Sequence, residues 1–337
     1  MYQIDCDTNA TVDDSYYVLL FYGSERDYPS MKTSFISMLL IIALSIAGIG
    51  CAAKNSVVGA ETAGAEASVE VKAGQVVADS AATEDSSEVD FTRNYSLEIK
   101  DEVRSAIAGA SSMQDEISRI EKIAEKYSGY SAYAKTQAEK DTAAGWVCDV
   151  WDCELNTLCT RVAGIADDEK REELLTDQKN WNSMKDEVMA DNIGGSEDNG
   201  STYPVLESGF MESITQNRCN ILANEIAKSR NENFKMPERS IYGTFVDNQG
   251  TGRMCSSLIT RAGDGDDNEA IISIHQMALL DGTFKDKGDG ELEFIGNRNN
   301  IKGIIKINGW DEATLEITQS NDEIYNVGLN YTFDFAF

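Results

Sequence analysis

The sequence predicts an α+β protein of two domains, in which an N-terminal helical hairpin or bundle precedes a small antiparallel β-barrel or sandwich. Apolar residues recur at intervals of three and four from Ile99 to Ile226, which is the period of helices with one buried face. From Ser240 the period changes to two, and turn-forming clusters separate short segments, as in a sheet of antiparallel strands. We place the boundary near 235–239, where Pro237 disfavours a helix.

These patterns divide the chain into five predicted parts. They are an untranslated or disordered upstream segment (1–30), a signal peptide ending in a lipoprotein cysteine (31–51), a disordered linker (52–93), a helical domain (94–235) and an antiparallel β domain (236–337).

Residues 31–51 have the layout of a secretory signal peptide. Met31, which we interpret as the true start, is followed by Lys32, an apolar run to Ile49 and small residues before a cysteine. The run is shorter than the roughly 20 residues that span a bilayer. Cys51 stands where bacterial lipoproteins carry their lipid, so we expect lipidation there and an exported protein that faces outward at the cell surface or envelope. A plain cleaved signal and an uncleaved anchor are the alternatives.

The linker 52–93 is rich in Ala, Glu, Ser, Val and Gly, and Phe91 is its one large aromatic residue. Such a composition buries too little apolar surface to offset the entropy of ordering. We therefore expect a flexible tether between the membrane and the folded part.

Five amphipathic helices are predicted around 99–107, 113–127, 147–165, 174–188 and 211–226. Ser112 and the pair Asp167–Asp168 are expected to cap the second and fourth of them, and the fourth should stop near Gly194. Trp151 and Trp181 fall on apolar faces and are predicted to be core residues.

Four pieces in order carry a family resemblance: WDCELNTL (151–158), LLTDQKNWNSMKDE (174–187), GGS (194–196) and ITQNRCNILA (214–223). Together with KTQAEKD (135–141), they resemble the N-terminal domain of the LprI-type lysozyme inhibitors, over roughly residues 130–230. The resemblance implies a secreted helical domain, often on a lipoprotein, that inhibits lysozyme in some members. The positions that match its motifs are expected to be mostly structural: Trp151, Asp152, Glu154, Leu155, Asn156, Gln178, Trp181, Gly194, Gly195, Ser196, Thr215 and Arg218.

The cysteines leave the disulfide pattern open. Cys148, Cys153 and Cys159 cluster on one predicted helix, and Cys219 lies on the last one. In an exported domain Cys219 can pair with one of the three, and the sequence does not choose among them. Cys255 makes the number of cysteines in the folded part odd, so at least one is free or intermolecular.

The charge is strongly acidic, with 58 acidic and 29 basic residues and a net charge of -29. This balance argues against a nucleic-acid partner, which needs a basic face. It suits a basic partner such as lysozyme or another muramidase, or simply solubility. The loop from Ile193 to Pro204 carries Glu197 and Asp198; it is either a binding loop that projects into a cleft or an ordinary connection between helices.

In the β domain we predict strands at 253–261, 269–280, 291–296, 301–307 and 313–318, seven or eight in all with the remaining segments. Tyr331, Phe333, Phe335 and Phe337 alternate, which predicts one aromatic face on the last strand. Carboxylates at Asp264, Asp266, Asp267 and Glu269 can offer oxygens to calcium, but they lack a complete calcium loop, so a solvated turn is the preferred interpretation.

Catalysis is not predicted. A Ser-His-Asp or Cys-His site would have to use His275, the one histidine, which we place inside a strand. No phosphate loop, dinucleotide fingerprint or zinc-ligand pair is present in the sequence, so no catalytic residue, metal or cofactor is assigned. The predicted function is that of a membrane-tethered lipoprotein that binds and inhibits lysozyme-type muramidases. The alternatives are an envelope binding or structural module for a glycan, a peptide or another surface protein and, least favoured, an acid-dependent glycan hydrolase.

Overall fold

The computed structural model describes residues 89–263, 268–276 and 278–337. The predicted upstream segment, the signal peptide with Cys51 and nearly all of the linker lie outside these residues, and so do Asp264, Asp266 and Asp267.

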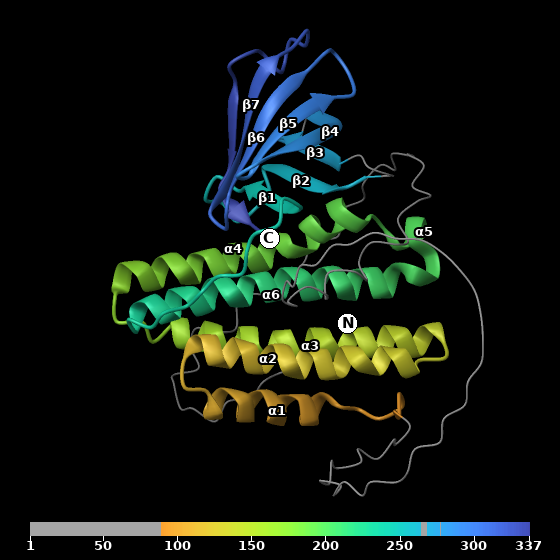
Figure 1. Ribbon diagram of the computed structural model, residues 1–337, viewed down its shortest axis with the longest axis vertical. Helices are drawn as coiled ribbons and strands as arrows, with labels where there is room; N and C mark the ends of the chain where they lie inside the picture. Colours follow the sequence, from red (N-terminus) through yellow and green to blue (C-terminus); the bar gives the residue numbers. More distant parts are fainter. Residues whose placement is uncertain (1–88, 264–267, 277) are drawn as a thin grey trace, which may run out of the picture. The chain divides into compact units, whose positions relative to one another are not determined.

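The helices of the described chain occupy its first part, and α1, α2, α3 and α6 lie side by side with nearly aligned axes (Figure 1). Their bounds, with two short 3-10 turns, are α1 (Ser96–Gly109), α2 (Met113–Gly129), η3 (Tyr130–Tyr133), α3 (Gln137–Val162), α4 (Asp168–Ile193), α5 (Ser196–Asn199), η4 (Gly200–Thr202) and α6 (Tyr203–Ser229). None of the helices in this part of the chain is both long and apolar enough to cross a membrane.

The predicted caps of α2 and α4 are confirmed. The side chain of Ser112 accepts a hydrogen bond from the Asp115 N–H at the start of α2, and Asp167 accepts one from the Lys170 N–H at the start of α4. Gly194 ends α4 with φ 73°, a backbone conformation that favours glycine.

The starts of α3 and α6 lie furthest ahead of those that the apolar spacing predicts. α3 starts at Gln137 because Thr136 and Glu139 form a capping box, in which each side chain bonds the backbone of the other. α6 starts at Tyr203 because Pro204 occupies its first turn, where a missing N–H costs nothing. Pro204 therefore belongs to α6 and does not close the loop.

Trp151 and Trp181 are both 1% exposed, which confirms them as core residues. A second aromatic cluster joins the start of the described chain to α3. In it Phe91 stacks on Trp146 at 5.5 Å between ring centroids, and Tyr95 meets the same indole edge-on at 4.7 Å. Such ring pairs contribute stability beyond the apolar area they bury.

The second part is one antiparallel sheet, seen as the twisted set of strands in Figure 1, with the strand order β8-β7-β6-β5-β4-β3-β2-β1-β9. The strands are β1 (Gly243–Asp247), β2 (Ser256–Ala262), β3 (Asn268–Ile274), β4 (Ala278–Gly288), β5 (Glu291–Gly296), β6 (Lys302–Asn308), β7 (Glu312–Gln319), β8 (Asn330–Phe333) and β9 (Phe335–Ala336). The predicted α+β class is confirmed, with a barrel-like sheet in place of a sandwich.

The two edges of this sheet are consecutive in the chain, which nearly closes it. β8 pairs with β7, while β9 pairs with β1 on the opposite edge. Phe333 lies opposite Ala313, and Ala336 lies opposite Phe245. All four belong to the sheet's core, so Phe333 and Ala336 share a face although they are three residues apart.

The extra residue that makes this possible is Asp334, which acts like a bulge at the change of partner. The prediction of one aromatic face is therefore wrong beyond Phe333. Phe335 lies under the Arg218 guanidinium, 5.7 Å from ring centroid to Cζ, and Phe337 stacks on Trp181 at 6.1 Å. Side-chain alternation alone does not reveal this bulge. Asp334 is a polar residue between two aromatic ones, which is also the pattern of a regular strand.

The predicted strand 269–280 is also wrong as a single element. It is two strands, β3 and β4, with His275 and Gln276 in the turn between them at φ 50° and 53°. The apolar residues on both sides of the turn continue the alternation, so the pattern shows no break. His275 consequently lies at the end of the sheet, exposed, and not inside a strand.

Candidate functional site

The twelve positions of the family motif separate by exposure. Most are buried and lie where helices meet, namely Trp151, Glu154, Leu155, Gln178, Trp181, Thr215 and Arg218. Gly194 and Gly195 are half-buried at the end of α4, and Asp152, Asn156 and Ser196 are exposed. Only the exposed positions are available to a partner protein, and the buried ones set the frame on which these stand.

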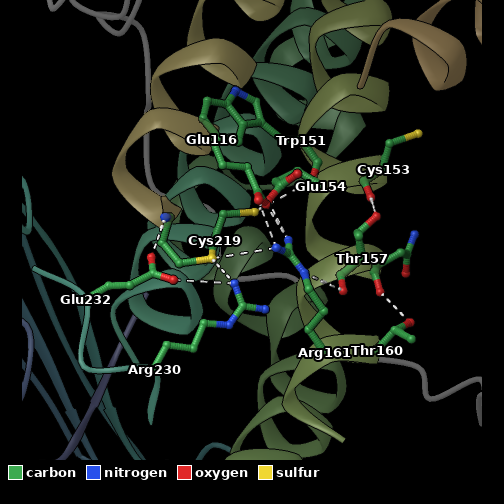
Figure 2. Close-up of polar contacts among 12 residues, drawn as sticks. Glu116, Trp151, Cys153, Glu154, Thr157, Thr160, Arg161, Cys219, Arg230 and Glu232 are labelled. Carbon is green, nitrogen blue, oxygen red and sulfur yellow. Dashed lines mark hydrogen bonds and ion pairs between the residues drawn. The ribbon is translucent and has the colours of Figure 1, made fainter. Parts of the chain in front are cut away.

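Glu154 is the centre of that frame. It is 0% exposed on α3, and it accepts a hydrogen bond from Nη2 of Arg161 at 3.3 Å, two helical turns later on the same face. Arg161 also forms a two-pronged ion pair with Glu116 of α2, whose Nη1–Oε2 arm measures 2.9 Å. Figure 2 shows both carboxylates converging on the one guanidinium.

Two carboxylates and one arginine leave this buried cluster one positive charge short. Burial raises the pKa of Glu154 well above its ordinary value, and the neighbouring Glu116 raises it further, against the opposing effect of Arg161. The neutral form of Glu154 is thus favoured over the charged one. Arg161 then links α3 to Glu116 of α2 without a second full negative charge in the core.

The same cluster extends to the end of α6 through Met113. The Met113 sulfur accepts from Arg161 and from Arg230, each at 3.6 Å, and the Met113 N–H donates to Glu232 at 2.8 Å (Figure 2). Glu116, Arg161 and Arg230 are residues of the frame that the motif positions do not include. In the sequence, Arg161 could have been found from its spacing of two helical turns from Glu154. Nothing in the sequence indicates that Glu116 pairs with Arg161.

A second buried contact joins α4 to α6. Nε of Arg218 donates to Oε1 of Gln178 at 2.7 Å, and burial lowers the pKa of Arg218 although Asp177 lies near it. Together these contacts hold α2, α3, α4 and α6 at fixed spacing, so residues on their exposed faces keep fixed positions too.

On this frame, Asp149 and Asp152 of α3 and Glu212 of α6 form what we call the α3–α6 acidic face. Burial raises the pKa of Asp149 to about 6, and the charge of Asp152 adds to the shift although Lys100 opposes it. The pKa of Asp152 is raised as well, because its neighbours partly desolvate a carboxylate that is otherwise exposed, with Lys185 opposing. Burial raises the pKa of Glu212 in the same way. Asp149 and Asp152 are thus close enough to repel each other, and the charges of all three carboxylates act on the Cys148 thiol.

The end of α4 adds two more acids, Glu187 and Asp191. Burial raises the pKa of Asp191 to about 6, and Glu187 adds to the rise. The last turn of α4 holds no basic residue, although the helix dipole favours one there. Negative charge in the last turn is therefore unfavourable for the helix dipole.

The connection after α4 is ordered. Asn199 donates from Nδ2 to the Ile193 carbonyl at 2.6 Å and to the Gly195 carbonyl at 3.0 Å, which folds the segment back on the helix end. Glu197 and Asp198 remain exposed on its outer side. The segment extends the acidic surface of α4 by two charges.

No disulfide joins the cysteines within the described residues, so none of the three possible Cys219 pairings is formed here. Cys148 donates to the Ser208 carbonyl at 3.0 Å, and Cys219 donates to the Trp151 carbonyl at 3.7 Å. Burial raises the pKa of Cys148, of Cys219 and, to about 11, of Cys159. The reactive thiolate form of these three cysteines is therefore disfavoured at neutral pH.

His275 lines a cavity of about 410 Å³ that also contains Asp247 and Asp334, at the place where the sheet changes partner. The imidazole Nδ1 of His275 lies 3.4 Å from the Cys255 sulfur. The backbone N–H of His275 donates to the Ser256 hydroxyl at 3.1 Å. A nucleophile–base pair needs a third group that orients the base. Within the described ranges, no carboxylate hydrogen-bonds the imidazole, so the geometry of a catalytic triad is incomplete.

Comparison with known proteins bears on the helical frame. Residues 129–222 match the family model described as Lysozyme inhibitor LprI. The match covers less than a third of the chain.

The LprI match confirms the resemblance predicted for roughly 130–230. It covers α3, α4 and most of α6, and it includes the acidic face, while the sheet lies outside it. The description of this family names an inhibitor of lysozyme. No curated protein and no solved structure matches the chain.

Proposed function

We propose that this protein binds and inhibits lysozyme-type muramidases through its LprI domain, while exported and tethered to a membrane by a lipid on Cys51. The observation that carries the proposal is the α3–α6 acidic face inside the segment that matches an inhibitor family. Close carboxylates such as Asp149 and Asp152 repel each other, and a basic partner relieves that repulsion.

The chemistry of the partner follows from the charge. Lysozymes are typically basic proteins, and a chain with a net charge of -29 attracts them over several ångströms before contact. Muramidases cleave glycans with a pair of carboxyl groups in a cleft. An acidic surface held against the basic rim of that cleft blocks the substrate, and it does so without entering the catalytic pair.

Rigidity supports the same function. Glu154, Arg161 and Glu116 fix α2 against α3, and Arg218 with Gln178 fixes α4 against α6. A binding surface carried on fixed helices loses little conformational entropy on association. The face is therefore preorganised for a partner with complementary charge.

Inhibition of a basic lysozyme by the purified protein tests the proposal. We expect roughly stoichiometric loss of lysozyme activity. The triple variant Asp149→Asn, Asp152→Asn, Glu212→Gln should weaken binding by about tenfold or more, since each close charge pair contributes about 1 kcal/mol or more.

A matched control separates the face from net charge alone. Asp289, Glu316 and Glu323 are exposed acids of the sheet part, and neutralising these three changes the net charge by the same amount. Equal weakening in both triple variants would show that no specific face is used. Absence of binding at low salt would refute lysozyme recognition, since charge attraction is strongest there.

The tether is tested separately by labelling cells with a lipid precursor. We expect label on the natural chain and none on Cys51→Ala. Equal label on both chains would exclude Cys51 as the acceptor.

A further inference from the structure

A cavity of about 310 Å³ lies between α6 and the turn that joins β6 to β7. This is the lower end of the volumes typical of small-ligand sites. Asn224, Glu225 and Lys228 of α6 line one side, and Asn308, Trp310 and Asp311 line the other. Apart from Ile221, the lining lies outside the LprI match, which ends at residue 222.

The α6 side of the cavity is a single helical face. Asn224 and Lys228 are four residues apart, so they project from neighbouring turns in the same direction. Glu225 is held by two ammonium groups, Lys228 at 2.7 Å and Lys170 at 3.1 Å. The Glu225 carboxylate is therefore held in place before any ligand arrives.

Trp310 is fixed on the opposite wall. Its indole N–H donates to the Pro237 carbonyl at 2.8 Å, which sets the plane of the ring. The Arg239 guanidinium covers one face of the indole, 4.5 Å from Cζ to the ring centroid, and is itself anchored by a bond to the Phe337 carbonyl at 3.0 Å. With one face covered and the edge bonded, Trp310 is a rigid aromatic platform beside the cavity.

The lining excludes most classes of ligand. A wholly apolar molecule would leave the amides and carboxylates of this wall without partners. An anion would meet Glu225 and Asp311, whereas a cation would meet Lys228, and the two lysines that neutralise Glu225 leave little net charge. What fits is a neutral molecule with one apolar face for the indole and a rim of hydroxyl groups that donate and accept hydrogen bonds.

A pyranose sugar has this form, because its axial C–H groups make one face apolar while its hydroxyls surround the ring. We propose that the cavity between α6 and the β6–β7 turn binds a sugar ring, stacked on Trp310 and hydrogen-bonded by Asn224, Asn308 and Asp311. This site is independent of muramidase binding: the proposed acidic face and this cavity are separate surfaces with different ligands.

Indole NMR resonances of the full chain, labelled at tryptophan, provide the test. The Trp310 resonance is assigned by its loss in Trp310→Phe. We expect N-acetylglucosamine, its trimer or maltotriose to shift this resonance saturably, with a dissociation constant of about 1 mM, typical of a small shallow site. Adenosine, a planar ring with a smaller hydroxyl rim, and glycerol, a polyol without a ring, serve as comparison ligands.

Variants then locate the site by calorimetry with the best of the sugars. Trp310→Ala should weaken binding by about tenfold or more, and Asn224→Ala by about threefold or more. Asn224→Ala removes one amide from a helix surface, so it keeps the test valid if the tryptophan variant disturbs the turn. Glu323→Gln, at an exposed position of the β7–β8 connection near the opposite end of β6, should bind as the natural chain does.

Three results would overturn the proposal. One is the absence of a Trp310 shift with every sugar up to about 50 mM, well above the expected dissociation constant. Another is equal affinity in the natural chain and Asn224→Ala together with Trp310→Ala. The third is a shift caused by adenosine or glycerol as strongly as by the sugars.

Discussion

At the scale of the residue, Glu154 has the most consequential environment. A charged residue is expected at the surface, yet Glu154 is fully buried among Arg161, Glu116 and the apolar side of α3. The sequence indicated its place only through the family motif. The partner Glu116 comes from another helix, and periodicity along one helix says nothing about contacts across two.

Replacing Glu154 by glutamine should flatten the pH dependence of stability. The folded pKa is raised above the ordinary value of 4.5, so stability from the protonated group is full below pH 4.5 and is lost as pH rises. Between pH 4.5 and the raised pKa of folded Glu154, the free energy of unfolding of the natural chain falls by about 1.4 kcal/mol for each pH unit. Glu154→Gln, which mimics the neutral acid, removes this component.

Urea unfolding from about pH 5 to about pH 9 measures the difference in slope between the two chains. Glu316→Gln, at an exposed position of β7, is the control and should keep the natural slope. A Glu154→Gln chain with an unchanged slope would mean that Glu154 is ionised in the folded protein.

At the scale of the element, the helices were predicted better than the strands. Within the described residues, apolar spacing located the five long helices but not all their bounds. It missed the start of α3, which depends on the capping box at Thr136, and it carried that helix to Ile165 although α3 ends at Val162. The strands were harder because the turn at His275 and the extra residue at Asp334 leave no gap in the alternation. Both events are decided by pairing across the sheet, which a single strand's sequence does not contain.

Gly282 of β4 shows how closely the strands approach. A Cβ there would overlap the Ile295 carbonyl oxygen and lie 2.7 Å from Cα of Gly296. Gly282→Ala should therefore lower stability by about 2 kcal/mol or more, as overpacking does. Gly145→Ala is the matched substitution: it lies in α3 with no atom within 4 Å of the added Cβ, and should raise stability by about 1 kcal/mol.

Thermal unfolding followed by circular dichroism compares the two alanine variants. Opposite shifts of the midpoint are expected. A stable Gly282→Ala chain would show that β4 and β5 can separate without cost.

At the scale of the whole molecule, contacts join the helices to the sheet. Phe337 stacks on Trp181 of α4, and Thr244 of β1 donates to Asn192 at 3.1 Å. The change of apolar period predicted a helical part and a β part, and the structure shows both. The contact between them was not predicted, because the sequence around Phe337 and Trp181 does not indicate that these two residues stack. The acidic face was likewise hidden, since 58 acids offer many pairings by chance.

Phe337→Ala should destabilise both parts together. Phe337 is 2% exposed, and truncation of a buried phenylalanine costs about 3–5 kcal/mol. We expect the helical circular dichroism signal and the Trp310 NMR resonance to report unfolding at the same midpoint. That midpoint should be lower than in the natural chain. Two separate midpoints, with the helical one unchanged, would show that the parts unfold independently.

The change of partner at Asp334 has a consequence for how the protein is made. Until β8 and β9 are in place, β1 and β7 each present a row of unbonded peptide groups, and such borders recruit strands from neighbouring chains. During translation β8 and β9 are synthesised after β1 to β7. Chains truncated just before Asn330 should consequently aggregate during synthesis. Chains that include β8 and β9 should not.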